Sequence, residues 1–326
     1  MVALRKDTGP DYVKISSKIF LDKFEEKNCF SASGALFNKY MTLLHRRLKN
    51  DGTNIKLPHC WYRWGDEVVR YRMPYLNWDH EYAAYTQVIW DGAISEKYDP
   101  EDHVIRTASE YADEFISKYS GTEGAEMAID EVYDGAPFEF QNEYRKLRET
   151  LKQLGSDKTA FFDDVSVNMI LPLFENVIRS FPHEFRVIEN EKEDFIEIFR
   201  TMIEGGTSIK DLFNITEDFW FFFCHHLRVK CHENVPSSTL NVWKEKIPEE
   251  TELFEKKLQS YAHRFCDNRN NLPRLKKLLK EWEDNDREFR ELLDKLPDDE
   301  EDILTFVQTV RSGRSKTPNE IMHEGT

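Results

Sequence analysis

Helical periodicity is the feature that most limits what this chain can fold into. Apolar residues recur at spacings of three and four along most of its 326 residues, as on one face of an amphipathic helix. In the first half this pattern predicts helices over 11–28, 34–50, 104–119, 122–135 and 136–155. In the second half it predicts helices over roughly 161–181, 191–204, 216–232, 249–268, 273–296 and 300–311. The sequence therefore predicts a mainly α fold.

A short linker divides the chain into two expected domains. The segment GSDKT at 155–159 is small and polar, and the acidic excess grows beyond it. We expect a helical N-terminal domain over 1–154 that carries one small β-hairpin, followed by an all-helical C-terminal domain over 160–311. The polar residues 312–326 are expected to form a disordered tail.

Charge and composition exclude several classes of protein. The formal net charge of -16 argues against nucleic-acid or anionic-membrane binding over the whole surface. No stretch approaches 18 uncharged apolar residues, and the N-terminus lacks an apolar core of signal-peptide length, so no membrane association is expected. The five cysteines are odd in number and widely spaced, which is typical of reduced thiols in a cytoplasmic protein.

One segment departs from the helical pattern: LPHCWYRWGDEVVRYRM at 57–73. Two runs rich in aromatic and β-branched residues, 59–64 and 67–73, flank Gly65-Asp66. A two-residue loop with glycine first is typical of a type II′ turn, so we predict a hairpin near 59–73. A hairpin after an amphipathic helix is the layout of a winged helix, whose arginines reach phosphates. The alternative is a turn whose tryptophans pack beneath helices.

Basic residues gather around this segment. Between Asn38 and Arg72 there are eight lysines and arginines against three acidic residues. This local excess indicates a surface for a polyanion or an acidic protein partner, although cations also favour a helix end for its dipole alone. The candidate binding residues are Arg46, Arg47, Lys49, Trp61, Arg63, Trp64, Arg70 and Arg72.

Recognised signatures of catalysis are absent from the sequence. No Walker phosphate loop, G-x-G-x-x-G, H-E-x-x-H or G-x-S-x-G motif occurs. The segment CHHLRVKCH at 224–232 offers five residues of metal-ligand type, Cys224, His225, His226, Cys231 and His232. In a continuous helix its two cysteines lie about 10.5 Å apart, and no Cys or His pair has the i, i+4 spacing. We therefore expect no catalytic residue, no metal ligand and no cofactor.

Three stretches of the first half resemble a known family. They are ALFNKYMTLLHRRLKNDG (35–52), WYRWG (61–65) and YADEFISKYSGTEGAEMAIDEVYDGAPFEFQ (111–141). They are similar to the leading helix, the turn and the later helix pair of an archaeal-type Panacea domain, of the SocA-like antitoxin superfamily. The resemblance covers about residues 30–150. The chain departs from the family at Asp66, where a proline is usual, and near Asp130 and Tyr133, where the usual histidine is absent.

The resemblance implies a helical binding domain and not an enzyme. Members of the superfamily are linked to toxin neutralisation and to proteolytic-adaptor roles. The expected function is therefore that of an antitoxin-like regulatory protein that binds a protein partner such as a toxin. A DNA-binding transcription regulator that uses helix 34–50 and the hairpin is the second hypothesis. A metal-dependent hydrolase or nuclease is the third.

Overall fold

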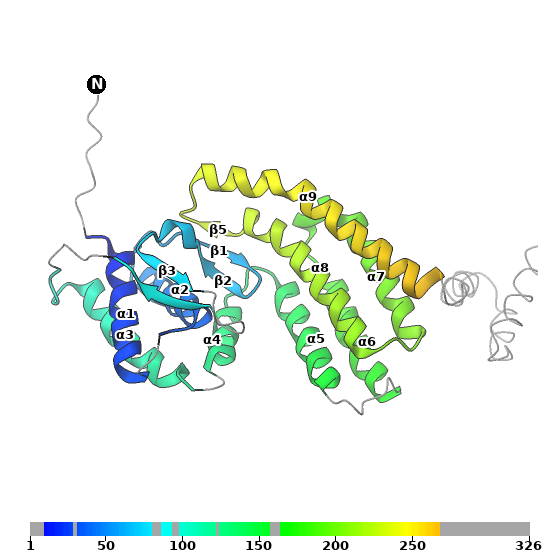
Figure 1. Ribbon diagram of the computed structural model, residues 1–326, viewed down its shortest axis with the longest axis horizontal. Helices are drawn as coiled ribbons and strands as arrows, with labels where there is room; N and C mark the ends of the chain where they lie inside the picture. Colours follow the sequence, from blue (N-terminus) through cyan, green and yellow to red (C-terminus); the bar gives the residue numbers. More distant parts are fainter. Residues whose placement is uncertain are drawn as a thin grey trace, which may run out of the picture. The chain divides into compact units, whose positions relative to one another are not determined.

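The computed structural model describes residues 10–28, 31–79, 86–92, 98–121, 124–156 and 164–267. Over these ranges the protein has nine α-helices and two small antiparallel sheets, which confirms the predicted mainly α fold (Figure 1). The chain divides into two compact units, one made of Met1–Asn142 with Trp220–Glu250 and the other of Glu143–Phe219 with Thr251–Thr326. The helices predicted at 273–296 and 300–311 and the tail at 312–326 lie outside the described residues.

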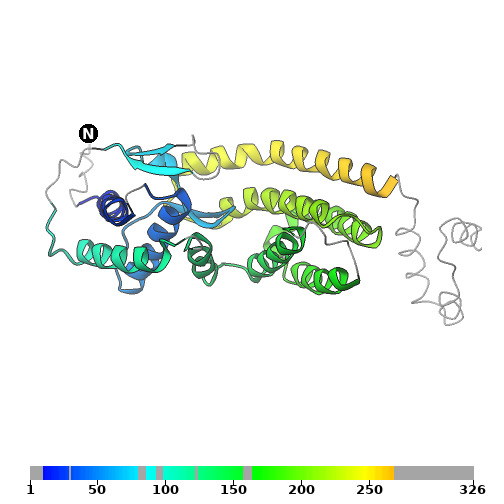
Figure 2. The same ribbon diagram turned by 60° about the horizontal axis from the view of Figure 1, so that its bottom comes forward.

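The first unit is built around the helices α1 (Tyr12–Asn28), α2 (Gly34–Asn50), α3 (His103–Tyr119) and α4 (Gly124–Tyr133). Local signals set two of their starts, since the side chains of Ser33 and Asp102 accept hydrogen bonds from the first backbone N–H groups of α2 and α3. Helix α1 lies beside α3 (Figures 1 and 2). The core contains Phe20 of α1, whose ring stacks on Tyr40 of α2 with centroids 4.2 Å apart.

Segment 57–73 forms the predicted hairpin, but its turn lies two residues before the predicted position. Strand β1 (His59–Tyr62) pairs with β2 (Gly65–Val68) so that Tyr62 faces Gly65, and Arg63-Trp64 makes the turn. Gly65 has a φ of 92°, which L side chains rarely adopt, and a Cβ there would lie 3.0 Å from the Tyr133 ring. The predicted Gly65-Asp66 loop is therefore wrong. Gly65 lies in strand β2, where its backbone conformation and its close packing against α4 both favour glycine.

The rest of segment 57–73 and its surroundings hold structure that the pattern did not predict. Residues Arg70–Arg72 form the 3-10 turn η1 and do not continue the second strand. Strand β5 (His232–Glu233) adds to the free side of β1, which gives the order β2-β1-β5. A separate sheet pairs β3 (Leu76–Asp79) with β4 (Gln87–Trp90).

Residues 220–250 belong to the first unit, so the observed division differs from the expected boundary at 155–159. Side chains of this segment hydrogen-bond to the loops of the hairpin region. Trp220 Nε1 donates to the Arg63 carbonyl at 2.9 Å, and Asn234 Nδ2 donates to the Leu57 carbonyl at 3.0 Å. These contacts and the β1–β5 pairing join residues 220–250 to the N-terminal part of the first unit.

The second unit is helical throughout its described part. The elements here, three of which run on into the first unit, are α5 (Glu139–Ser156), α6 (Asp164–Arg179), η2 (His183–Ile188), α7 (Glu189–Glu204), α8 (Ile209–Lys230), α9 (Ser237–Tyr261) and the π-helical turn η3 (Ala262–Asp267). Stacked rings form the core, with Phe174 on Phe199 and Phe195 on Phe219. Helix α9 continues through Pro248, whereas the prediction started at 249. Among the described helices, none has the length and apolar character needed to cross a membrane.

Candidate functional site

The three basic residues predicted on α2 all engage acidic side chains of the chain itself. Each charged nitrogen lies within ion-pair distance of a carboxylate oxygen. The pairs are Arg46 with Asp66 (3.1 Å), Arg47 with Glu114 (2.7 Å) and Lys49 with Glu233 (2.8 Å). A phosphate that bound this helix face would have to compete with these carboxylates.

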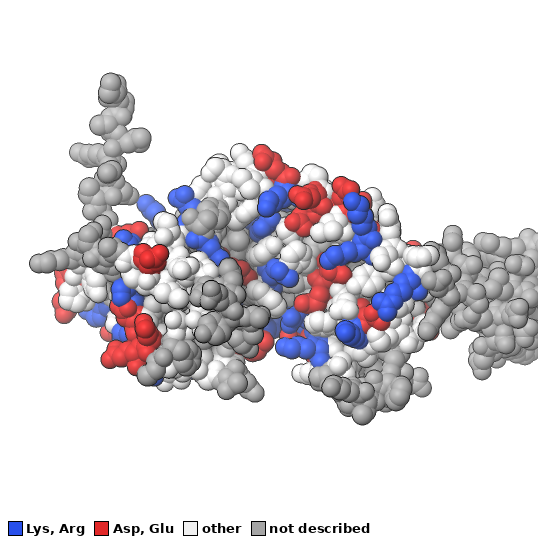
Figure 3. Space-filling view, viewed as in Figure 1, with Lys and Arg blue, Asp and Glu red and all other residues white. Residues whose placement is uncertain are grey.

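The predicted arginines of the hairpin region lie in separate environments. The guanidinium of Arg63 lies 3.7 Å from the centroid of the Phe221 ring, and that of Arg70 lies 4.5 Å from the centroid of Trp78. Arg72 is exposed on η1. On the face shown in Figure 3, basic and acidic side chains are interspersed. Arg63 and Arg70 thus lie against different aromatic rings, and Arg72 is on the 3-10 turn.

The two predicted tryptophans differ in exposure. Trp61 is 7% exposed, and its ring meets that of Tyr133 edge-to-face with centroids 5.6 Å apart. The Arg46 guanidinium lies 5.6 Å from the centroid of the same indole. Trp64, at the hairpin turn, is 45% exposed. Trp61 therefore belongs to the core of the unit, and Trp64 belongs to its surface.

The backbone of the turn is held from several sides. Trp220 Nε1 donates to the Arg63 carbonyl at 2.9 Å, and the backbone N–H of Trp64 donates to Glu67 Oε1 at 3.0 Å. The buried ammonium of Lys39 donates to the carbonyl of Trp64 and, at 3.0 Å, to that of Asp66. The exposed indole of Trp64 is thus carried by a fixed stretch of backbone.

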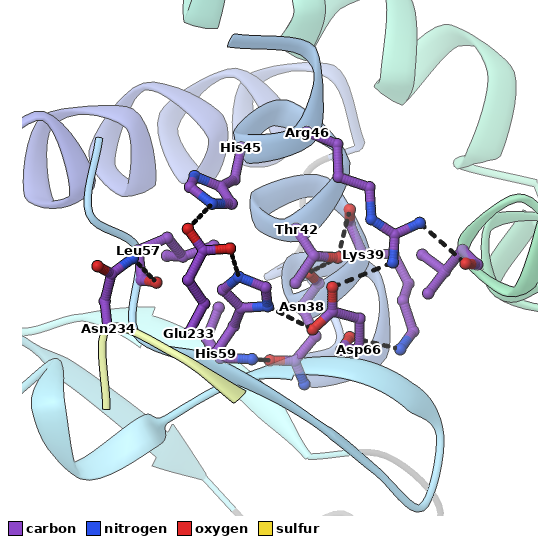
Figure 4. A network of polar contacts seen from close by, with 12 residues as sticks. Asn38, Lys39, Thr42, His45, Arg46, Leu57, His59, Asp66, Glu233 and Asn234 are labelled. Carbon is purple, nitrogen blue, oxygen red and sulfur yellow. Dashed lines mark hydrogen bonds and ion pairs between the residues drawn. The ribbon is translucent and has the colours of Figure 1, made fainter. Parts of the chain in front are cut away.

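Asp66 is the centre of a buried polar network, shown in Figure 4. It is 1% exposed, and its carboxylate lies 2.6 Å from His59 Nδ1 and 3.1 Å from Arg46 Nη2. Burial alone would raise the pKa of Asp66, but the hydrogen bond from His59 and the charge interactions with His59, Arg46 and Lys39 lower it. An ionised Asp66 accepts a hydrogen bond from His59 Nδ1–H, and the other ring nitrogen of His59, Nε2, is buried without a hydrogen-bond partner.

Next to this network, His45 of α2, His59 of β1 and Glu233 of β5 form what we call the His–His–Glu cluster (Figure 4). One ligand-type atom from each residue lies within 4.8 Å of the others, and no other group of this kind is found in the described ranges. Both histidines are buried, at 1% and 9% exposure, while the Glu233 side chain is 31% exposed. Two imidazoles and a carboxylate are a donor set that suits a divalent transition-metal ion.

The protonation states in the cluster follow from burial and charge. Burial and the neighbouring His59 lower the pKa of His45. Burial alone would raise the pKa of Glu233, but the hydrogen bond from Lys49 and the two nearby histidines lower it. The cluster therefore combines a neutral imidazole of His45 with an ionised carboxylate near neutral pH.

Sequence patterns gave no signal for this cluster. Lys49, in the same helix as His45, is separated from Glu233 by 184 residues. Residues so far apart in the sequence form no motif of fixed spacing. His59 lies inside the aromatic segment 57–73, but no motif there marks it as a ligand.

The segment CHHLRVKCH has no comparable arrangement. Cys224 is buried in α8, and His225 hydrogen-bonds to Arg228 through Nδ1 (2.9 Å) and to the Tyr62 hydroxyl through Nε2 (3.3 Å). Burial lowers the pKa of His225 to about 3. In the described part of the chain, none of the Cys and His residues of this segment joins a group of three potential metal ligands.

Comparison of the chain with protein-family models, with curated proteins and with solved structures finds no match.

Proposed function

We propose that this chain is a non-enzymatic regulatory protein of the antitoxin-like kind, which binds a protein partner, with a toxin as the expected partner. The surface of this chain that contacts the partner is the hairpin turn Arg63-Trp64 in the first unit. The resemblance of residues 30–150 to the Panacea domain supports the class. The exposure of Trp64 on a fixed turn supports the surface.

The single observation that carries the proposal is the presentation of Trp64. An indole that is 45% exposed at a hairpin turn is available for contact. Tryptophan is among the residue types that contribute most binding energy at protein interfaces. Because four hydrogen bonds hold the turn and its neighbours, little conformational entropy is lost when a partner covers the ring.

A protein partner fits the charges better than a nucleic acid does. Nucleic-acid affinity comes largely from lysines and arginines that neutralise phosphates. Here Arg46, Arg47 and Lys49 already pair with carboxylates, and the whole chain carries a formal net charge of -16. The His–His–Glu cluster does not favour an enzyme either, because His45 is only 1% exposed.

Replacing Trp64 with alanine is expected to weaken partner capture at least about tenfold, since a hot-spot tryptophan contributes about 2 kcal/mol or more. The experiment captures tagged chain from cells of the native host and quantifies co-purifying protein per chain. Tyr98→Ala is the matched control, because Tyr98 is a 39% exposed aromatic of the same unit. Recovery of no stoichiometric partner with the unaltered chain would contradict the proposal, and equal recovery with Trp64→Ala would exclude the turn. The captured protein is then expressed alone, where we expect growth arrest that co-expression of this chain relieves.

DNA binding is expected to be absent at low salt in a mobility-shift assay. The physical reason is that the basic residues of α2 pair with carboxylates of the chain itself. In the hairpin region, Arg63 and Arg70 each lie over a different aromatic ring. A shift that weakens as salt rises and disappears in Arg63→Ala/Arg70→Ala would instead support the DNA-binding hypothesis.

A further inference from the structure

We propose that His45, His59 and Glu233 bind one divalent transition-metal ion, for which Zn²⁺ is the best match. The donors are Nε2 of each histidine and a carboxylate oxygen of Glu233. Nitrogen donors with one carboxylate suit zinc, whereas Mg²⁺ and Ca²⁺ prefer oxygen ligands alone. This site goes beyond the proposed function, and neither inference depends on the other.

The separations in the cluster are close to those of a coordination sphere. His45 Nε2 lies 3.7 Å from Glu233 Oε1, and His59 Nε2 lies 3.6 Å from Glu233 Oε2. Donors of a tetrahedral zinc site, with bonds of about 2.0–2.1 Å, lie about 3.3 Å apart. The two histidines face different oxygens of Glu233 (Figure 4), and one donor atom from each of the three residues lies within 4.8 Å of the others, so the donors would move closer together around an ion.

The histidine nitrogens that face the cluster have no hydrogen-bond partner. Nε2 of His45 and Nε2 of His59 are both buried and unpartnered, as is Nδ1 of His45. A buried polar atom without a partner costs about 1–3 kcal/mol, so such atoms call for an explanation. A metal ion satisfies both Nε2 atoms at once.

An ion pair between Glu233 and protonated histidines explains the cluster less well. Separations of 3.6 and 3.7 Å lie within ion-pair distance but exceed the hydrogen-bonding range of about 2.7–3.2 Å, so such pairs leave both Nε2 atoms without a hydrogen bond. Two imidazolium rings with centroids 5.0 Å apart would also repel each other. A metal ion bound through both Nε2 atoms avoids that repulsion.

His59 and Glu233 have the outer partners expected of metal ligands, whereas Nδ1 of His45 has none. Histidine ligands usually donate their second N–H to a carboxylate, which fixes the ring and the tautomer. His59 does so through Nδ1 to Asp66, which Arg46 in turn holds. The Glu233 carboxylate is likewise oriented by Lys49 Nζ at 2.8 Å.

The ion would fasten β5 to the first unit. Strand β5 is two residues long and makes only two residue pairs with β1, so it has few hydrogen bonds of its own. A metal ion held by α2, β1 and β5 closes a long loop between the hairpin and β5, which stabilises the folded state by reducing the entropy of the unfolded chain.

The experiment measures metal content and affinity on full-length protein purified without a polyhistidine tag. We expect elemental analysis to find about one zinc ion per chain. After chelation, calorimetric titration with ZnCl₂ should recover a single site. Affinity should fall at least about 100-fold in His45→Gln, His59→Gln and Glu233→Gln, and about 10–100-fold in Asp66→Asn, which removes the charge of the outer partner of His59. His226→Gln should leave the affinity unchanged, since His226 is a buried histidine with an unpartnered Nε2 outside the cluster.

Two further readouts keep the test decisive if a histidine variant folds poorly. Glu233→Gln alters the most exposed member, so its fold is the least at risk. Zinc at about 100 times its Kd should raise the Tm of the unaltered protein by about 5–10 °C and leave that of Glu233→Gln unchanged. Co²⁺ should give the intense visible bands of four-coordinate cobalt, lost in the same variant.

Two results would overturn the metal site. One is failure of the chelated, folded protein to bind Zn²⁺, Co²⁺, Ni²⁺ or Fe²⁺ at any single site. The other is binding that survives substitution of all three cluster residues. Neither result touches partner capture through Trp64, which is measured without regard to metal.

Discussion

Replacing Phe20 with alanine is expected to lower the free energy of unfolding by about 4 kcal/mol, within the range for removing a buried aromatic ring. Phe20 is fully buried among α1, α2 and α3. Its ring stacks on Tyr40 at 4.2 Å and meets Phe115 edge-on at 5.8 Å. The substitution opens a cavity that two packed aromatic rings cannot easily fill. Urea titration of the variant and of the unaltered protein, followed by circular dichroism, measures the difference.

Two control variants separate this cavity effect from a general loss of stability on replacing any aromatic residue. Phe20→Leu keeps part of the volume and should lose clearly less stability than Phe20→Ala. Tyr98→Ala removes a ring that is 39% exposed and should change stability by no more than about 0.5 kcal/mol. A loss below about 1 kcal/mol for Phe20→Ala would mean that the three helices repack freely around this position.

Replacing Asp66 with alanine is expected to lower the free energy of unfolding by about 3 kcal/mol, when measured with chelator present. Removing one partner of a buried ion pair costs about 3–5 kcal/mol, because the other charge stays behind. We place this case at the lower end, since the Arg46 side chain is 27% exposed and can reach water. His59 also loses the acceptor of its Nδ1 proton.

Asp66→Asn and Asp113→Ala test the origin of the Asp66 effect. The asparagine keeps an acceptor for His59 but not the charge. The free energy of unfolding of Asp66→Asn should therefore lie between those of the unaltered protein and Asp66→Ala. Asp113 pairs with Lys23 but is 50% exposed, so Asp113→Ala should cost no more than about 1 kcal/mol. Equal losses of stability in Asp66→Ala and Asp113→Ala would show that burial does not determine how much Asp66 stabilises the fold.

The Asp66 effect should also depend on pH in one direction. The folded state lowers the pKa of Asp66. The carboxylate therefore stabilises the fold fully above its unfolded pKa, about 3.9, and this stabilisation is lost as the pH falls through the lower folded pKa. The difference between the unaltered protein and Asp66→Ala should accordingly stay constant from pH 7 to about 5 and shrink in stronger acid. A difference that grows in acid would contradict an ionised Asp66.

Elements whose signals are local could be predicted closely. Helix 34–50 was predicted from its apolar periodicity, and α2 spans Gly34–Asn50 with Ser33 as its cap. Helix 104–119 corresponds to α3, which starts one residue earlier at His103. Capping and periodicity act over one or two turns, so the sequence alone contains the information that sets them.

The register of the hairpin could not be predicted in the same way. Its existence follows from the aromatic runs, but Gly65 lies in strand β2 and not in the turn. The reason is tertiary, because the space beside Gly65 is filled by the ring of Tyr133 from α4. The same holds for the basic residues of α2, whose carboxylate partners come from β2, α3 and β5.

The sequence by itself determined the helical class, the limits of several helices and the presence of a hairpin near 59–73, because short-range hydrogen bonds and apolar periodicity govern these. Only the tertiary structure brought Glu233 to His45 and His59 and placed Asp66 beneath Arg46. Such contacts join residues far apart in the chain, and their energies depend on burial and on distances of a few ångström. No spacing within a linear pattern encodes either quantity.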